Sequence, residues 1–556
     1  MTPDAPVLIV GAGPVGMACA LLLARHGVAC TVLEAAAQRP TVGSRSICTQ
    51  RDVLDILDRI GCAAPMVAEG VTWTVGRTYY RDTEVASITF PEVGRSAYPP
   101  FINIPQTSVE RYLEERLLAE PMVTLHRGVA VTGLAQDPSG VIVTAGDARW
   151  RAPWLVGCDG SHSTVRRLLG VPFPGESFAD QFLICDIRAD LPFPAERRFH
   201  FDPPWNPGRQ VLVHPQPDGV WRIDWQVPAD FDLAAERACG ALDRRVRAIT
   251  GGTPYTEVWA SQYRFHQRIV PAYRVGRCLL AGDAAHVMAP FGARGLNSGL
   301  ADAENAAWKL AHVVRGWAPE SLLDSYHDER HAAGTENLRV TGATMRFLVP
   351  GTDAERAHRL RVLRAALTDP AARAEIDSGR LAAPHCYDAS PLTTPAPTAD
   401  PAAAAAAATA AAAGPGVAAD PAATTDPAGA AGRSSPRPGE LAPDGPCRVP
   451  GEPAVTRLRQ AFGPQWTVLG FGPDVPRPHW VTAAGLCLRR VVRAGRPAGP
   501  GDVMDTECVL HDAYPIDSAA WLIRPDGHLA AVVPAGRGAR ERLTTALLRA
   551  IGAPTG

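Results

Sequence analysis

The chain has 556 residues, more than one hydrophobic core supports, so we expect three or four domains of about 150 residues each. Lys and Arg number 55 and Asp and Glu number 57, and the net charge of −2 gives no reason to expect a nucleic-acid or anionic-membrane partner. The composition therefore favours a globular protein that acts on small molecules.

Cysteine, lysine and leader patterns exclude further classes of chemistry. None of the 12 cysteines forms a C-x-x-C pair or stands at a zinc-type spacing from histidine, so we expect neither a disulfide framework nor a metal site. Lys309 is the only lysine, which leaves no other candidate for a Schiff base. Because the start has no basic leader and no apolar run reaches membrane-spanning length, we expect a soluble, cytoplasmic protein without membrane contact.

The first predicted unit is a strand, a glycine-rich turn, a helix and a second strand. The turn reads G-x-G-x-x-G, in which Gly11 permits a tight bend, Gly13 admits a pyrophosphate close to the backbone, and Gly16 allows close helix packing. The helix N-terminus attracts phosphate, and Glu34, at the end of the second strand, is placed to accept from ribose hydroxyls. The pattern predicts dinucleotide binding, with Pro14 and Val15 completing the turn.

The middle of the chain mixes helices and strands. Thr107 and Glu110 have capping-box spacing, which predicts a helix start at 107, and residues 154–170 pass from a strand to a helix. Between about residues 181 and 267 the sequence pattern changes to one of alternating apolar and polar residues, which predicts a series of strands. In residues 220–227 one face is apolar, and the other carries Arg222, Asp224 and Gln226.

The later part begins with "LLAGDAAHVMAPFGARGLN", residues 279–297, and continues as helices near 296–314 and 320–347. From 391 to 440 the composition falls to Ala, Pro, Thr and Gly, which predicts a flexible linker. Residues 441–556 read as a small α/β module with a hairpin turn at Pro525-Asp526-Gly527.

Three motifs in this order, at 11, "GCDGSHSTVRRLLG" at 157 and "LLAGDAAHVMAPFGARGLN" at 279, resemble those of the class A FAD-dependent aromatic monooxygenases of the para-hydroxybenzoate hydroxylase type. The resemblance covers about residues 1–390 and implies an α/β fold. The Rossmann-like FAD-binding domain would comprise 1–75, 102–180 and 268–390, with an inserted β-sheet substrate domain at 76–101 and 181–267.

The resemblance also implies a set of cofactor residues. Gly282 and Asp283 would meet the ribityl and ribose region of FAD, and Asp159 and Gly160 would lie near both FAD and the nicotinamide. A loop would place its backbone along the isoalloxazine ring, and its residues are Pro290, Gly292, Gly295, Leu296 and Asn297. Two side chains would also contact the cofactor, those of Arg45 and Gln106.

For several of these residues a purely structural role is an open alternative to a role in cofactor binding. Asp283 could be a helix cap, and Arg45 and Gln106 could be ordinary solvated side chains. His286 is more simply read as a satisfied structural histidine than as a base. Arg166 and Arg167 could meet a nucleotide phosphate or could cap the preceding helix.

The implied reaction is hydroxylation of a phenolic or polyketide-like aromatic, with NAD(P)H and O₂ as co-substrates and a C4a-hydroperoxyflavin as oxygen donor. A phenol needs a proton acceptor in the strand-rich region. The sequence does not choose among His200, His214, Asp224, Tyr263 and His266, and Arg222 is a candidate anchor for a substrate carboxylate. The alternative for Arg222 and Asp224 is a polar face turned to water.

Within that family, the amino-acid sequence of several stretches most resembles the branch that includes 3-(3-hydroxyphenyl)propionate hydroxylase and polyketide-tailoring hydroxylases. That branch implies a thioredoxin-like domain at 441–556, which without paired cysteines would be redox-silent and would serve for packing or homodimer contact. Two rival functions remain: another flavin oxidoreductase on the same fold, such as an epoxidase or alkene reductase, and a non-catalytic flavin-bound protein.

Overall fold

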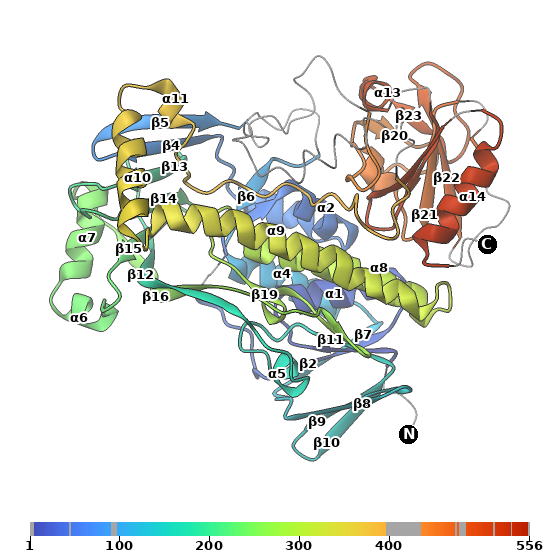
Figure 1. The fold of residues 1–556 in the computed structure, drawn as a ribbon, viewed down its shortest axis with the longest axis horizontal. Coiled ribbons are helices and arrows are strands. Elements are labelled where there is room, and N and C mark those ends of the chain that lie inside the picture. The colour runs from blue at the N-terminus through green and yellow to red at the C-terminus, as the bar shows by residue number, and fades with distance from the viewer. Residues whose placement is uncertain are drawn as a thin grey trace. The chain divides into compact units, whose positions relative to one another are not determined.

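The computed structural model describes residues 5–43, 46–90, 97–395, 435–472, 475–476, 485–514, 518–534 and 536–553 (Figure 1). The chain divides into two compact units. The first comprises 1–92, 98–307 and 330–382, and the second comprises 93–97, 308–329 and 383–556. The second unit thus takes in 308–329, which the predicted domains assign to the FAD-binding part, and the predicted boundaries stay a prediction.

The first unit contains a six-stranded sheet that is built around two buried parallel strands. Its order is β17 (Arg274–Val275), β18 (Cys278–Leu280), β11 (Trp154–Gly157), β1 (Val7–Val10), β2 (Cys30–Glu34) and β7 (Val123–Arg127). All residues of β1 and β11 are buried, as expected of central parallel strands covered on both faces. The helix α1 (Pro14–Arg25) follows β1, which confirms the predicted strand, turn, helix and strand.

An eight-stranded sheet forms the other large layer of this unit. Its order is β19 (His286–Val287), β16 (Thr256–Ile269), β12 (Gly175–Arg188), β15 (Val220–Val227), β14 (Gln210–Pro215), β13 (Arg197–Phe201), β4 (Val75–Tyr80) and β5 (Thr83–Thr89). Its strands thus come from two stretches of chain, 75–89 and 175–287.

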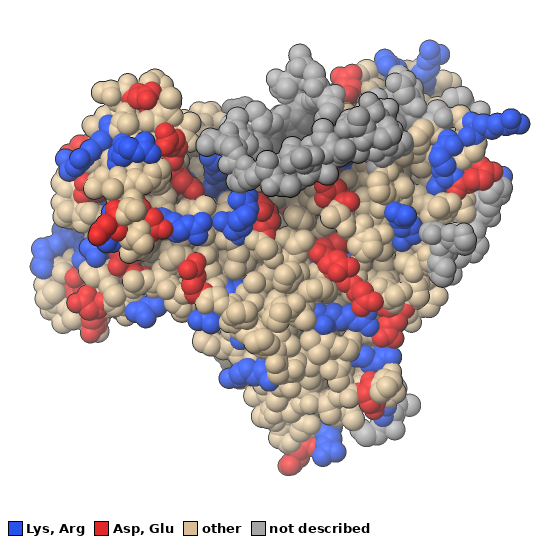
Figure 2. All heavy atoms as spheres, viewed as in Figure 1, with Lys and Arg blue, Asp and Glu red and all other residues tan. Residues whose placement is uncertain are grey.

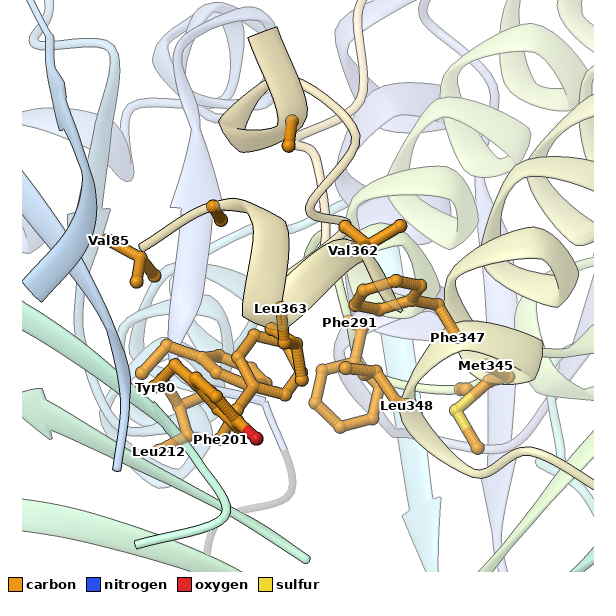
Figure 3. Close-up of a cluster of buried hydrophobic side chains, with 14 of the residues drawn as sticks. Tyr80, Val85, Phe201, Leu212, Phe291, Met345, Phe347, Leu348, Val362 and Leu363 are labelled. Carbon is orange, nitrogen blue, oxygen red and sulfur yellow. The ribbon is translucent and has the colours of Figure 1, made fainter. Parts of the chain in front are cut away.

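Both faces of this sheet are covered. The outer face, with Trp221 and Ile223, packs on α7 (Ala241–Thr250). The inner face, with Phe199 and Leu212, forms a cluster with Phe291 and residues of α9 (Asp324–Leu348) and α10 (Asp353–Ala365). Figure 3 shows Phe291 among Leu348, Phe347 and Leu363 of this cluster. The predicted alternation in 220–227 is confirmed, but the reading of a polar face turned to water is wrong, because Arg222 is only 2% exposed.

The remaining elements of the first unit are short strands and helices. The strands are β3 (Cys48–Gln50), β6 (Phe101–Asn103), β8 (Gly133–Asp137), β9 (Gly140–Ala145) and β10 (Ala148–Ala152), and the helices are α2 (Arg51–Arg59), α3 (Ala63–Glu69), α4 (Gln106–Leu118), α5 (Thr164–Leu168), α6 (Leu233–Ala238), α8 (Arg294–Val314) and α11 (Pro370–Arg373). The predicted capping box at Thr107 is wrong. The helix α4 starts at Gln106 without a side-chain cap, and Glu110 instead accepts from Gln106 Nε2 at 2.8 Å.

The second unit contains its own six-stranded sheet. The order is β20 (Cys447–Arg448), β23 (Val503–Asp505), β22 (Leu486–Arg493), β21 (Trp466–Gly470), β24 (Ser518–Ile523) and β25 (Leu529–Pro534), and the helices are α13 (Val509–Ala513) and α14 (Ala539–Ala550). The hairpin at Pro525–Gly527 is confirmed by the pairing of β24 with β25. A thioredoxin-like identity for this part stays a prediction, and most of the predicted linker, 396–434, lies outside the described residues.

A buried charged cluster ties this sheet to the end of α8 and the start of α9. Glu329 accepts from Lys309 Nζ at 2.7 Å and from both terminal nitrogens of Arg524 at 2.6 and 2.9 Å. Arg524 also pairs with Asp526, which accepts from Trp308 Nε1 at 3.0 Å. Lys309 is fully buried in an ion pair, so the only lysine of the chain has a structural role in the second unit.

Surface properties agree with the balanced composition. Figure 2 shows basic and acidic side chains interspersed over the visible face. Among the described residues, no helix has the length and apolarity needed to cross a membrane.

Candidate cofactor and substrate site

The glycine-rich turn after β1 is shaped by two close backbone approaches. Gly11 has φ +102°, and a Cβ there would lie 2.5 Å from the carbonyl oxygen of Cys158. A Cβ on Gly16 would lie 2.0 Å from the carbonyl oxygen of Gly11, so neither position admits a side chain. Gly13 differs, because a Cβ there would meet no atom of the protein within 4 Å. Its missing side chain leaves open space at the N-terminus of α1.

Glu34 is held beside this turn. One carboxylate oxygen accepts from the Ala12 amide at 2.7 Å, and the other accepts from the Ala36 amide at 2.8 Å. These bonds orient the carboxylate next to the turn while leaving lone pairs for a further donor.

The segment after β11 lies directly against the first turn, since the Cys158 amide donates to the Val10 carbonyl at 2.8 Å. Asp159 accepts from the amides of Thr164 and Val165 at 2.7 and 3.0 Å, so its side chain caps α5. Gly160 has φ +78° and, like Gly13, open space where a Cβ would be. The aspartate therefore shapes the loop, and the glycine leaves its backbone bare.

The third motif packs onto the first. The Val15 side chain lies against Gly282 and Gly299, where Cβ atoms would be 3.0 and 2.7 Å from its Cγ2. The three segments, far apart in the sequence, thus meet in one place. Asp283 is exposed at this junction although its neighbours Gly282 and Ala284 are buried.

Asp302 is a buried carboxylate that the sequence analysis missed. It accepts from the Gly282 amide at 3.0 Å, from Arg330 Nε at 2.6 Å, and pairs with His286 Nε2 at 2.7 Å. Burial raises the pKa of Asp302, but Arg330 and His286 outweigh burial and hold the pKa below its ordinary value. His286 is fully buried and its Nε2 pairs with Asp302, whereas its Nδ1 has no partner among the described residues, so the reading as a satisfied structural histidine is met at one ring nitrogen only. An acid among the Ala and Leu of a helix was the only signal in the sequence.

The loop from Pro290 to Asn297 has two consecutive residues with positive φ, Gly292 at +86° and Ala293 at +56°. A Cβ on Gly292 would lie 2.1 Å from the Arg380 carbonyl oxygen. Asn297 fixes the loop to β3, because its side chain accepts from the Gln50 amide at 3.0 Å and donates to the Cys48 carbonyl at 2.9 Å.

The other predicted residues of the loop lie at the start of a helix. The helix α8 begins at Arg294, two residues before the predicted start near Leu296. Pro290 is exposed and Leu296 half-buried, and a Cβ on Gly295 would meet nothing within 4 Å. The N-terminal turn of α8 therefore also presents bare backbone.

Gln106 and Arg166 act within the protein. Gln106 Oε1 accepts from the Ser46 amide at 3.3 Å, while Arg45, its predicted companion, lies outside the described residues. Arg166 is buried and donates to the carbonyls of Ala284 and Ser161 at 3.0 and 2.8 Å, which links the second and third motifs. Arg167 is exposed and bonds Thr164 Oγ1 at 2.9 Å.

These residues fit an extended dinucleotide. The positions without a side chain face open space where three segments converge, and they are Gly13, Gly160 and Gly295. An acid stands at the edge of the first turn, Glu34, and another at the third motif, Asp283. Bare amides at a helix N-terminus suit a pyrophosphate, and carboxylates suit ribose and ribityl hydroxyls.

The substrate candidates separate onto the two faces of the eight-stranded sheet. The pairing register places His214, Arg222, Asp224 and Tyr263 on the inner face, with Phe182 and Leu212. His200 and His266 lie on the opposite face, where the first stacks on Tyr79 with ring centroids 4.7 Å apart and the second bonds Ser177 Oγ at 2.7 Å. The face that reaches the loop at Phe291 therefore excludes these two histidines.

Arg222 is already paired. Its Nε and one terminal nitrogen donate to the two oxygens of Asp186 at 2.8 and 2.7 Å, which disfavours the predicted role as a substrate-carboxylate anchor, and that role stays a prediction. Burial lowers the pKa of Arg222, but the bonds to Asp186 outweigh it and the pKa is raised.

Asp224 and His214 have strongly shifted pKa values. Burial raises the pKa of Asp224 to about 7, with Asp186 adding to the rise and Arg222 opposing it. Burial, with Arg197 and Arg222, holds the pKa of His214 well below its ordinary value. Tyr263 is half-buried, and its ring centroid lies 6.3 Å from that of Trp259.

Comparison with known proteins gives a family match over most of the first unit. Residues 4–341 match a family model described as an FAD binding domain.

Curated relatives cover much or all of the chain. Rifampicin monooxygenase of Streptomyces venezuelae is 36% identical over 63% of this chain and 73% of its own length. Dialkyldecalin synthase of Streptomyces rugosporus is 34% identical over 67% and 78%, and 6-methylpretetramide 4-monooxygenase of Streptomyces rimosus is 33% identical over 99% and 94%.

Among solved structures, the flavin-dependent monooxygenase PieE, crystallised with FAD and substrate, matches with a TM-score of 0.80 over 100% of both chains at 24% identity. At that identity the likeness establishes the fold, including that of the second unit.

Proposed function

Because the chain belongs to the FAD binding domain family and relatives such as rifampicin monooxygenase and 6-methylpretetramide 4-monooxygenase are monooxygenases, it is an FAD-dependent monooxygenase, and we propose that it hydroxylates a phenolic or polyketide-like aromatic substrate with NAD(P)H and O₂. The observation that carries the proposal is the convergence of three glycine-bearing segments at Gly13, Gly160 and Gly282, with the acids Glu34 and Asp283 beside them.

In this proposal the chain binds FAD with backbone and acids. The amides at the N-terminus of α1, in the turn Gly11–Gly16 with Pro14 and Val15, take the pyrophosphate, and Glu34 accepts from ribose hydroxyls. Asp283 accepts from the ribityl hydroxyls. The loop Pro290–Asn297 lies along the ring system, where the start of α8 stabilises negative charge.

When bound, FAD supplies the electrons taken from NAD(P)H and the activated oxygen that is passed to the aromatic ring. The remaining tasks fall to the protein. The Phe291 region and the inner face of the eight-stranded sheet exclude water and hold the substrate, and a side chain on that face takes the phenolic proton.

A second candidate is a flavoprotein that does not hydroxylate. The relative named dialkyldecalin synthase, 34% identical over 67% of this chain, favours it, because its name denotes a synthase rather than a monooxygenase. Another flavin oxidoreductase on the same fold, such as an epoxidase or an alkene reductase, belongs to this alternative.

The test starts from the purified full-length protein. We expect a yellow protein with bound FAD, NAD(P)H oxidation stimulated by a phenolic compound, and a product that is heavier by one oxygen atom. A colourless protein that cannot take up FAD would contradict the proposal. A yellow protein that never oxidises NADH or NADPH with any of a series of simple and polycyclic phenols would favour the second candidate.

The cytoplasmic location and a homodimer contact through the C-terminal part are also proposals, and they rest on the sequence. Light scattering of the purified protein tests the dimer.

A further inference from the structure

We propose that Asp224 binds and deprotonates the hydroxyl group of a neutral phenol, assisted by His214, and that the enzyme therefore prefers uncharged phenols to aromatic carboxylates. The inference rests on the proposed function, because it names the substrate class and the proton acceptor of that site. Three independent observations support it: the placement of Asp224 and His214 on one face of the sheet, a polar atom without a hydrogen-bond partner in each side chain, and the charges of the surrounding residues.

The two side chains lie side by side on one face of the sheet. Asp224 of β15 pairs with Leu212 of β14, and His214 pairs with Arg222. His214 is thus the diagonal neighbour of Asp224 on the inner face, a spacing of roughly 7–8 Å between Cα atoms that long side chains bridge. One small group can therefore reach both.

Both side chains have a buried polar atom without a partner among the described residues, Oδ1 of Asp224 and Nδ1 of His214. A buried acceptor without a hydrogen bond is costly, and native proteins rarely leave one unless it serves a function. Both residues are only half-buried as a whole, so they lie at the border of the packed interior. A phenol that reaches the pair with its own O–H donor would supply the missing hydrogen bond.

The pair lies on the side where the cofactor loop packs. The Trp73 ring is 6.3 Å from the His214 ring and packs in one cluster with Phe101 and Ala293 of the loop. On the same inner face, Phe182 is 5.6 Å from Phe291, which is also a loop residue. Loop residues thus meet this face at two places, and a ring bound between them would present its hydroxyl to Asp224.

The charges of this face do not suit a substrate carboxylate. Arg222 is paired through two hydrogen bonds with Asp186, and Arg197 donates to Ser378 Oγ at 3.3 Å. The register also places Arg188 on the inner face, where its Nε donates to the Asp218 carbonyl at 3.2 Å, and a substrate carboxylate on this face would in addition meet Asp224. A neutral phenol avoids that repulsion.

The proton transfer balances without another reactant. The phenolic O–H bond breaks, the proton forms an O–H bond with the Asp224 carboxylate, and the electron pair stays on the phenolate oxygen. The charged and titratable groups of the inner face around Asp224 are Arg222 on its own strand, His214 on β14, Arg197 on β13, Asp180 and Asp186 on β12, and Tyr263 on β16. With an Asp224 pKa of about 7, the acceptor form is lost as the pH falls below that value.

The experiment compares ligand pairs that differ only in charge. The probes are 3-(3-hydroxyphenyl)propionate with its matching neutral alcohol, and a dihydroxyanthraquinone with its carboxylate. Binding to the FAD-loaded protein is followed by the change in flavin absorbance, and turnover by NAD(P)H oxidation. We expect the neutral member of at least one pair to bind at least roughly tenfold more tightly, the discrimination typical of an unfavourable buried charge.

Asp224→Asn tests the residue, with Asp218→Asn as its control, because Asp218 is an exposed turn residue of the same hairpin. Retained FAD shows that a variant is folded. We expect Asp224→Asn to lower kcat for the neutral probe by roughly 100-fold or more and to abolish the fall in kcat/KM below pH 7, while Asp218→Asn changes neither. His214→Gln, expected to weaken neutral-probe binding, gives a second readout should Asp224→Asn not fold.

Three results would overturn the inference: tighter binding of the carboxylate in both pairs, binding of none of the probes, or an Asp224→Asn variant that matches Asp218→Asn. Failure of the proposed function looks different. In that case the protein binds the neutral probe and discriminates against its carboxylate, yet consumes no NAD(P)H with either.

Discussion

Gly13 and Gly16 belong to one turn but are constrained from different sides. A Cβ on Gly16 would collide with the Gly11 carbonyl, whereas a Cβ on Gly13 would meet nothing in the protein. We infer that ligand binding requires the first glycine, whereas the fold requires the second.

We therefore expect Gly13→Ala to fold normally but to bind FAD roughly tenfold or more weakly, a loss of about 1.4 kcal/mol or more. Gly16→Ala should instead lower the free energy of unfolding by about 1–3 kcal/mol, as overpacking does. FAD titration of the apoprotein and urea unfolding measure the two effects. Gly472→Ala is the control, since Gly472 also faces open space but lies outside the site. Equal FAD affinity in Gly13→Ala and Gly472→Ala would contradict this assignment.

Asp302 offers a second test at the level of one side chain. Replacing it by Asn removes the charge that pairs with Arg330 and His286 and leaves a buried arginine without its carboxylate. We expect Asp302→Asn to lose about 3–5 kcal/mol of unfolding free energy, the cost of breaking a buried pair from one side. Urea unfolding measures it, and the exposed Asp147→Asn should be neutral. A loss below 1 kcal/mol would show that the pair contributes little.

The sequence predicts the role of a residue when that role depends on nearby positions in the chain, and misses it when the role depends on a partner far away in the chain. The glycines of the first turn follow from backbone geometry within six positions, so their spacing is enough to find them. Arg222 was misread because its partner, Asp186, lies on another strand, and only the pairing register brings the two opposite each other. Asp302 was missed for the same reason.

At the level of elements, the ends of α8 and α9 are joined to the C-terminal sheet by ionised groups with no exposure. Burial raises the pKa of Glu329, but Arg524 and Lys309 outweigh burial and the pKa is lowered. Because its folded pKa lies below the unfolded value of about 4.3, Glu329 adds stability above that pH and loses it as the pH falls toward the folded value.

We therefore expect Glu329→Gln to lose about 3–5 kcal/mol at pH 7, since two cations are left buried, and to show a shallower loss of stability between pH 5 and 3 than the parent. Urea unfolding across that pH range measures both. The exposed Glu507→Gln should follow the parent curve. If Glu329→Gln loses stability between pH 5 and 3 as steeply as the parent, protonation of Glu329 does not contribute to acid unfolding.

Element type is well predicted where periodicity is strong, as in β1, α1, β2, α8 and the hairpin of β24 and β25. The alternation of residues 220–227 also identifies two faces correctly. It does not say what covers each face, because the covering residues, such as Phe291 and Leu363, come from other parts of the chain. The start of α4 was placed one residue late since capping depends on which side chain reaches which amide.

For the whole molecule, the C-terminal sheet helps to bury the chain between the end of α8 and the start of α9. Trp308 and Leu322 belong to one apolar cluster with Trp466 and Leu522. We expect a chain that stops at residue 395 to expose this cluster and to aggregate or to melt several degrees lower, although all three cofactor motifs remain.

Light scattering and thermal melting test this. A chain that lacks only residues 400–430 and keeps the C-terminal sheet is the control. A truncated chain that stays monomeric and melts with the parent would show that the sheet is dispensable for stability.

The domain plan of the molecule follows from the resemblance rather than from composition. The family match confirms the FAD-binding part. Composition and motifs could not show that residues 308–329 belong with the C-terminal part, because that grouping depends on contacts with strands more than 130 positions away.

Ala293 holds a left-handed backbone that costs a residue other than glycine about 1–2 kcal/mol, and its methyl group packs against the cluster of Cys48, Trp73 and Phe101. A library designed to broaden the range of accepted compounds should leave this position and Gly292 untouched. Diversity is better placed on the inner face of the eight-stranded sheet, at Leu212 and Ile184, the two residues that pair with Asp224 across the sheet.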